Sequence, residues 1–498
     1  MRLPFDDSHQ PPAVPARHAL LAAITLLTGC ATQPAGDSSF VHRWTQMGPN
    51  GDVSLRAIVA AGAACPMATV DGDRRPLEPR AAASPLAPSA LPTSGNPAFE
   101  AHFEVTACEL VLPRSVRQAS IDGQPVALPL AAPGRIVVVG DTGCRIQVRA
   151  KGSSPPIQDC ASQEHWPWPR IAAAAARSEP DLVIHVGDYH YREYCNDPES
   201  CASQHDLGIP VGYGWTGWDA DFFTPAAPLL KAAPWVVVRG NHENCDRGGE
   251  GWMRFLSPLP YRACGNQAYG TASHSVLTNN LTADAYRIDF GRQLTLVVAD
   301  NAGFEDYLPA SRKEQDVELL RRSLRALDAA TDGQPVWLLL HKPLWYEFLA
   351  ASAQPNALQE HLRHKLPADL QFVFAGHQHV FATLNFAAKD DPAGYPAARP
   401  AQLIVGNSGT QLEAFDPQSP LFEGRSGTGS KERSHPGSQV YDGMAASSGI
   451  LVNRYGFLLL ERAGGGWTAS LRDPDGRAIT QCRLHGERKA VACDFPGR

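Results

Sequence analysis

Five short motifs place acids, an amide, histidines and a tyrosine directly after apolar runs. They are GDTG at 140–143, GDYHY at 187–191, GNHE at 240–243, the histidine at 341 and GHQH at 376–379. A glycine before each acid, amide or paired histidine lets the backbone turn where a strand ends. Because ligands of α/β sheets gather at the carboxyl ends of strands, we expect the five motifs to converge on one place.

The donor types in these motifs indicate metal chemistry. Carboxylate, amide, phenol and imidazole groups together suit Fe, Mn and Zn. The set is larger than one ion needs, whereas two ions that share a bridging carboxylate would use all of it. Paired ions about 3.5–4 Å apart recur in enzymes that hydrolyse phosphate esters. The motifs therefore predict a dinuclear hydrolytic centre.

The motif series resembles that of the metallophosphoesterase (calcineurin-like) superfamily, over residues 135–460. Within it, the series is similar to the GDxG, GDxxY, GNH(D/E), xxxH and GHxH blocks of purple acid phosphatases. The broad superfamily has a histidine two residues after the first Asp, where this chain has Gly143. Tyr191, three residues after Asp188, fits the replacement found in purple acid phosphatases. The stretch 380–383 departs from the Tyr-Glu-Arg of many large members, which leaves subfamily and substrate open.

The resemblance implies a role for each motif residue. The ligands expected for the first ion, Fe(III), are Asp141, Tyr191 and His379. Those expected for the second ion, a divalent Fe, Zn or Mn, are Asn241, His341 and His377. Asp188 would bridge the two ions. His242 would stand at the substrate, where it stabilises the phosphoryl group or protonates the leaving oxygen.

The implied activity is that of an acid phosphatase acting on phosphomonoesters, with a small phosphorylated molecule as substrate. A metal pair lowers the pKa of bound water, so hydroxide can attack phosphorus in line below neutral pH. His242 would offset charge in the transition state. One alternative is a phosphodiesterase or nucleotidase with the same site. Another is a non-catalytic surface binding lipoprotein, which predicts a gap in the ligand set; the five motifs show none.

Short apolar runs and helical patterns predict an α/β fold. Eight runs read as strands buried on both faces, at 136–139, 182–186, 235–238, 294–299, 336–340, 372–375, 403–405 and 457–460. Helices are expected at 170–177, 316–330 and 358–366, and long loops at 388–401 and 415–438. With the resemblance, this predicts a metallophosphoesterase-type β-sandwich core flanked by helices, in αββα layers.

The length of 498 residues exceeds what one hydrophobic core usually serves. We expect a small β-rich N-terminal domain at 30–133 with a Pro/Ala-rich surface loop at 76–97, a catalytic domain at 134–475, and a disulfide-closed tail at 476–498. A net charge of −7 argues against nucleic acid as a stable partner. The sequence leaves the oligomeric state open.

The first thirty residues predict export. An uncharged apolar stretch at 19–29 follows Arg17 and ends in small residues, which is typical of a signal peptide. The sequence at 27–30, LTGC, resembles the lipobox of bacterial lipoproteins, in which Cys30 would carry the lipid anchor. We expect cleavage after residue 29 and a periplasm-facing or outer-surface lipoprotein that touches the membrane only through this anchor. The alternative reading is a first core helix.

The eleven cysteines fit an oxidising compartment. Without Cys30 an even ten remain, and eight of them form sequence-close pairs: 144/160, 195/201, 245/264 and 482/493. With the remaining 65 and 108, five disulfides are expected, although spacing alone does not prove connectivity. Metal-binding cysteines are the alternative, but the chain has no CxxC pair.

Overall fold

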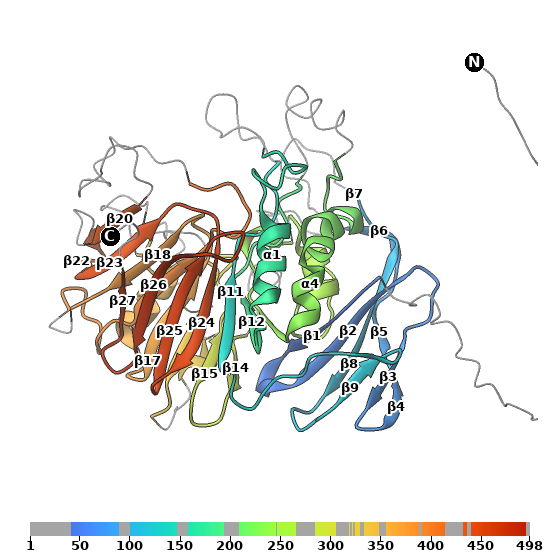
Figure 1. Ribbon diagram of the computed structural model, residues 1–498, viewed down its shortest axis with the longest axis horizontal. Coiled ribbons are helices and arrows are strands. Elements are labelled where there is room, and N and C mark those ends of the chain that lie inside the picture. The colour runs from blue at the N-terminus through green and yellow to red at the C-terminus, as the bar shows by residue number, and fades with distance from the viewer. Residues whose placement is uncertain are drawn as a thin grey trace, which may run out of the picture. The chain divides into compact units, whose positions relative to one another are not determined.

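Two β-sheets face each other in the computed structural model (Figure 1). Helices pack against the outer side of each sheet. The structure describes residues 41–88, 100–146, 158–193, 209–245, 247–264, 284–304, 318, 321, 324–328, 333–347, 355–387, 391–413, 432–435 and 440–494. The segment 1–40, with the expected signal peptide and Cys30, lies outside these residues.

The first sheet runs in the order β27-β26-β25-β24-β11-β12-β13-β1-β2-β8-β5. Its centre is a parallel trio, β11 (Arg135–Val139), β12 (Leu182–His185) and β13 (Trp235–Val237). Antiparallel C-terminal strands extend one side: β24 (Phe457–Ala463), β25 (Gly466–Arg472), β26 (Ala478–His485) and β27 (Ala490–Cys493).

The second sheet runs in the order β14-β15-β16-β17-β19-β18-β23-β20. Four neighbouring strands are parallel: β15 (Thr295–Val298), β16 (Val336–Leu339), β17 (Leu370–Ala375) and β19 (Ala401–Val405). The other strands pair antiparallel with their neighbours: β14 (Tyr286–Asp289), β18 (Phe381–Asn385), β23 (Ser448–Val452) and β20 (Glu432–His435).

Three apolar layers hold the sandwich together. Because side chains alternate along a strand, Val138 of β11 packs between the sheets while Val137 packs outward among the residues of α1 (Trp168–Arg177). On the far side, Leu338 of β16 packs with residues of α9 (Ala357–His364), among them Leu362. α4 (Thr224–Ala232) lies beside α1 (Figure 1). This arrangement confirms the predicted αββα fold.

The N-terminal strands continue the first sheet. β1 (His42–Met47) pairs in parallel with β13, with Gln46 opposite Trp235. β2 (Val53–Ala60), β8 (Val105–Leu112) and β5 (Glu78–Ala81) follow it outward. A small separate sheet contains β3 (Met67–Val70), β4 (Asp73–Pro76), β9 (Ala119–Ile121) and β10 (Gln124–Pro125). The N-terminal segment is thus β-rich, and β1, β2, β8 and β5 belong to the first sheet. The domain boundaries stay predictions.

Two predicted loops contain strands. Within 76–97, β5 and β6 (Ser84–Pro88) are extended, and 89–99 lie outside the described residues. Pro79 lies in β5, which is the edge strand of its sheet, and proline is tolerated in edge strands because they pair on one side only. Within 415–438, the described residues form β20. The loop predictions were wrong for these strands, whereas 391–400 contain no helix or strand.

The other predicted elements match the structure where it is described. All eight apolar runs are strands, α1 covers the Ala-rich stretch, and α9 covers most of 358–366. Within the helix predicted at 316–330, the structure describes the helical segment α8 (Arg325–Asp328). The remaining short elements are η1 (Pro49–Gly51), β7 (Glu100–Phe103), α3 (Trp215–Trp218), η2 (Asp219–Phe223), η3 (Asn241–Glu243), α5 (Gly249–Gly251), η4 (Trp252–Leu256), β21 (Val440–Tyr441) and β22 (Met444–Ala445).

Four disulfides confirm four of the five expected pairs. They join Cys65 to Cys108, Cys144 to Cys160, Cys245 to Cys264, and Cys482 to Cys493. Cys195 and Cys201 lie outside the described residues. Within the described ranges, no helix has the length and apolar character that crossing a membrane requires.

Candidate metal centre

Both sheets contribute to the candidate metal centre at the carboxyl ends of their parallel strands. Asp141, Asp188 and Asn241 follow β11, β12 and β13 of the first sheet. His341 and His377 follow β16 and β17 of the second. Since the sheets face each other across one apolar layer, the strand ends deliver side chains from five loops to one place, as the motif pattern predicted.

Three of the candidate ligands have a strained backbone. Asp141, Asp188 and His377 have φ values of +55°, +60° and +70°, in the left-handed region that non-glycine residues rarely adopt. The Asp141 N–H donates to Gly187 O at 2.9 Å, and the His377 N–H donates to the Asp141 carboxylate at 3.0 Å. Such strain costs roughly 1–3 kcal/mol per residue and is typical of functional sites.

Gly143 occupies the position at which the broad superfamily has a histidine. A Cβ at this residue would lie 2.7 Å from Tyr191 N and 2.9 Å from Tyr189 O, closer than real contacts allow. The loop that carries Tyr191 therefore fills the space that a side chain at 143 would need. This contact gives a physical reason why the glycine and the tyrosine occur together.

One group of donors surrounds the Tyr191 phenol. Its oxygen lies 2.6 Å from Asp188 Oδ2, 3.0 Å from His379 Nε2 and 3.3 Å from Asp141 Oδ1. His379 Nε2 is also 3.5 Å from Asp141 Oδ1. Asp141, Asp188 and Tyr191 are buried almost completely. These four residues are the predicted ligands of the first ion together with the predicted bridge.

A second group surrounds the Asn241 amide oxygen. Asn241 Oδ1 lies 2.9 Å from His341 Nε2 and 2.8 Å from His377 Nδ1. His341 Nε2 is 3.2 Å from Asp188 Oδ2. One ligand atom each from Asp188, His341 and His377 lies within 4.8 Å of the others, a spacing that a metal ion could bridge. Asp188 thus belongs to both groups.

Outer hydrogen bonds turn histidine lone pairs toward this centre. His341 Nδ1 lies 2.9 Å from Val186 O, and His379 Nδ1 lies 2.8 Å from Gln411 O. A carbonyl oxygen only accepts, so each Nδ1 carries the proton and each Nε2 is left as an acceptor. His341 Nε2 and Asn241 Oδ1 are then two acceptors in contact, which a cation between them would stabilise. The donor set therefore fits metal ions.

The buried carboxylates of the centre would also be stabilised by positive charge. Burial raises the pKa of Asp141 well above its usual range, and the negative charge of Asp188 raises it further. Burial on its own would lower the pKa of His341, but the carboxylates of Asp188 and Asp141 raise it. Two carboxylates buried together are costly unless cations compensate them.

His242 lies against the first group without being part of it. Its ring centroid is 3.7 Å from that of Tyr191, and its backbone N–H donates to Asp188 Oδ1 at 2.9 Å. Burial and the neighbouring Arg247 guanidinium lower the pKa of the His242 imidazole to about 3. The ring is thus held beside the candidate ligands.

Sequence reasoning missed three charged residues that support the centre. Glu243 accepts hydrogen bonds from the backbone N–H groups of Gly240, Tyr189 and His190, which fixes two motif loops together. Glu193 Oε1 lies 2.9 Å from His242 Nδ1, and Arg247 Nε donates to the same oxygen at 2.6 Å. Glu243 is the last residue of GNHE and could have been found there. The other two are single charges in loops and carry no spacing signal.

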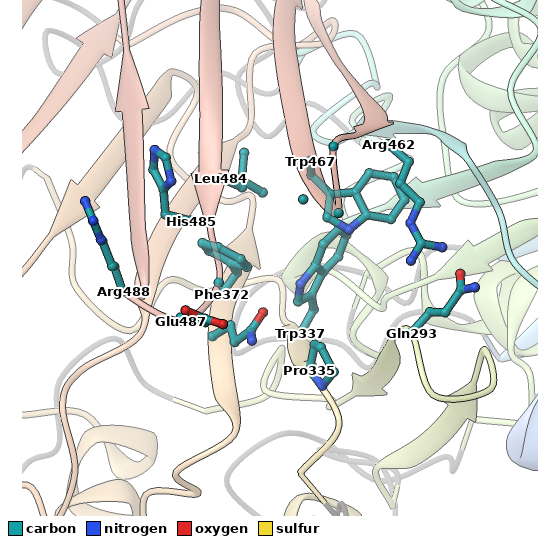
Figure 2. A pocket seen from close by; sticks show the side chains of 15 residues that line it. Gln293, Pro335, Trp337, Phe372, Arg462, Trp467, Leu484, His485, Glu487 and Arg488 are labelled. Carbon is teal, nitrogen blue, oxygen red and sulfur yellow. The ribbon is translucent and has the colours of Figure 1, made fainter.

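The cavity drawn in Figure 2 lies away from this centre. It measures about 530 Å³ and is lined by Pro335, Trp337 and Phe372, at the amino ends of β16 and β17, and by the turns after β24 and β26. His341 and His377 follow the carboxyl ends of the same two strands. The cavity therefore contains none of the predicted site residues.

The model of the calcineurin-like phosphoesterase family matches residues 134–381. The chain belongs to the calcineurin-like phosphoesterases. Among curated relatives, this calcineurin-like phosphoesterase is 22% identical over 305 residues to purple acid phosphatase 15 of Arabidopsis thaliana, covering 58% of this chain and 47% of the relative. It is 24% identical over 215 residues to purple acid phosphatase 22 of the same plant, covering 42% and 44%.

These matches confirm the purple acid phosphatase-like resemblance. The chain spans less than half the length of either relative. Among solved structures, it is similar to purple acid phosphatase PPD1 from yellow lupin, with a TM-score of 0.47 and 12% identity over 88% of this chain and 73% of that one. For a structure of PhoD the TM-score is 0.49, with 10% identity over 93% and 94%.

Proposed function

We propose that this calcineurin-like phosphoesterase is an acid phosphatase that hydrolyses phosphomonoesters at a dinuclear metal centre. The observation that carries the proposal is the division of seven oxygen and nitrogen donors into two groups that share Asp188. A single ion would leave several of these buried donors without a partner. Two ions that share a carboxylate would engage all of them.

Asp141, Tyr191 and His379 would hold one ion, which we propose is Fe(III), because a phenolate is a hard anionic donor. Asn241, His341 and His377 would hold the second, a divalent Fe, Zn or Mn, and Asp188 would bridge. When bound, the two ions supply Lewis acidity and lower the pKa of water. The chain contributes the orientation of the ligands, through the bonds from His341 to Val186 and from His379 to Gln411.

His242 would act on the substrate itself, on the phosphoryl group or on the leaving oxygen. Glu193 holds its Nδ1 at 2.9 Å, and the Tyr191 ring packs against its face. These contacts restrain the imidazole in one orientation before substrate arrives, and such preorganisation lowers the cost of reaching the transition state.

A hydrolysis screen tests this function. The protein loaded with iron and zinc is assayed on p-nitrophenyl phosphate, a monoester, and on bis(p-nitrophenyl) phosphate, a diester with the same leaving group. We expect turnover of the monoester below neutral pH and slower turnover of the diester. A protein that binds two ions per chain and hydrolyses neither ester would contradict the proposal.

We also propose that the enzyme is exported and anchored to the bacterial cell envelope through Cys30. The four described disulfides support an oxidising compartment, because cytosolic thiols are kept reduced. Small phosphorylated molecules outside the cytoplasm would then be its substrates.

A further inference from the structure

Two arginines that belong to none of the motifs lie beside the candidate centre. The Arg145 guanidinium carbon is 5.8 Å from the centre of the Tyr191 ring. Arg247 Nη2 is 2.8 Å from His242 Nδ1 and 3.0 Å from His242 Nε2. Since Tyr191 and His242 pack ring to ring, both guanidinium groups flank the same pair of side chains.

Each guanidinium retains hydrogen-bonding capacity. Arg247 uses Nε and Nη2 to bind the Glu193 carboxylate, at 2.6 and 2.9 Å. Within the described residues, its Nη1 donates to no neighbour, and its side chain is 20% exposed. Arg145 is partly exposed, and its guanidinium forms no ion pair with any residue that the structure describes.

Disulfides hold the two loops that carry these arginines. Arg145 follows Cys144, which is bonded to Cys160, and its backbone N–H donates to Gln158 Oε1 at 2.9 Å. Arg247 comes two residues after Cys245, which is bonded to Cys264. Loops restrained in this way hold their side chains in place with less freedom to lose on binding a ligand.

Resting on the proposed function, we infer that Arg145 and Arg247 bind the phosphoryl group of the substrate and make the site selective for doubly charged monoesters. Guanidinium groups match phosphate oxygens in geometry and charge. A monoester carries up to two negative charges and three terminal oxygens. A diester carries one charge and two terminal oxygens, so two cations beside the reacting phosphorus favour the monoester.

The test compares Arg145→Gln, Arg247→Gln and the conservative Arg145→Lys, all metal-loaded, with the wild type. Losing one charge-assisted hydrogen bond should raise KM for p-nitrophenyl phosphate about 10–100-fold. The ratio of kcat/KM for the monoester to that for bis(p-nitrophenyl) phosphate should fall at least about tenfold, with partial recovery in Arg145→Lys. Arg477→Gln, which changes a largely exposed arginine in the turn before β26, is the matched control.

Inorganic phosphate, titrated calorimetrically into the same metal-loaded proteins, separates this inference from the proposed function. If the wild type hydrolyses neither ester, the proposed function fails, while weaker phosphate binding by both glutamine variants would still support the arginine assignment. If phosphate affinity and the monoester-to-diester ratio are unchanged in Arg145→Gln and Arg247→Gln, the inference is overturned. An equal loss toward both esters, with phosphate affinity retained, overturns it as well.

Discussion

The Tyr191 phenol donates a hydrogen bond to Asp188 Oδ2 at 2.6 Å, across the loop that follows β12. The two residues are three positions apart, and the left-handed backbone of Asp188 turns its side chain back toward the tyrosine. This contact joins the residue that distinguishes the subfamily to the carboxylate shared by both donor groups. Loss of the Tyr191 phenol should therefore weaken one ion site, whereas loss of the Asp188 carboxylate should weaken both.

Tyr191→Phe should abolish colour. An Fe(III)–phenolate pair absorbs visible light by charge transfer, and the substitution keeps the ring packed against His242 while it removes the oxygen donor. The visible band of the iron-loaded protein should vanish, and the iron should become easier to reduce or remove. Retention of both the band and the iron would show that another tyrosine is the ligand.

His242→Ala and Asn241→Ala should separate chemistry from metal binding. The His242 ring contacts the first donor group, but His242 is not a predicted metal ligand. Its loss should therefore lower kcat about 10²–10⁴-fold and leave the metal content near that of the wild type. Asn241→Ala should instead lower occupancy of the divalent site, since Asn241 Oδ1 contacts both His341 and His377. Equal metal loss in both variants, measured by elemental analysis, would refute this division.

Gly143→Ala should destabilise the protein. The added Cβ would lie 2.7 Å from Tyr191 N. Because this nitrogen is a backbone atom, it cannot move away as easily as the end of a flexible side chain could. Overpacking of this kind costs typically about 1–3 kcal/mol. Gly464→Ala is a control for open space, since nothing lies within 4 Å of its Cβ position, although its φ of +57° adds backbone strain. Urea unfolding curves in which Gly143→Ala matches the wild type would contradict the close contact.

The mature protein should contain no thiol that reacts with an alkylating agent before reduction. Four pairs are bonded in the described residues, and Cys195 with Cys201 are expected to form the fifth. Peptide mapping should recover Cys245 linked to Cys264 and Cys144 linked to Cys160. Two or more free thiols in the folded, secreted protein would overturn the pairing.

Cys30→Ala should release the protein from membranes or leave its precursor uncleaved, if the LTGC sequence at 27–30 directs lipidation. Fractionation followed by N-terminal analysis of the product reads out both effects. Wild-type protein found in the cytoplasm with residues 1–29 retained would contradict the proposed export.

The sequence was most informative where one residue pattern has one structural meaning. Strands buried on both faces require continuous apolar runs, which is why β11 to β13 and β15 to β17 could be predicted and why the motifs behind them could be placed at one edge. The pairing of Gln46 with Trp235 joins strands far apart in the chain, and no local pattern records it. Glu193 and Arg247 lie beyond prediction for a similar reason, because a single charge in a loop shows its partner only in three dimensions.

The metal content of Asp188→Ala tests the central claim most directly. Asp188 Oδ2 is in contact with Tyr191 in one donor group and His341 in the other, so its removal should weaken both ion sites at once. Elemental analysis should find two ions per chain in the wild type, about one in Asn241→Ala, and well under one in Asp188→Ala. A wild-type protein that binds a single ion, or an Asp188→Ala variant that retains two, would contradict a dinuclear centre built around Asp188.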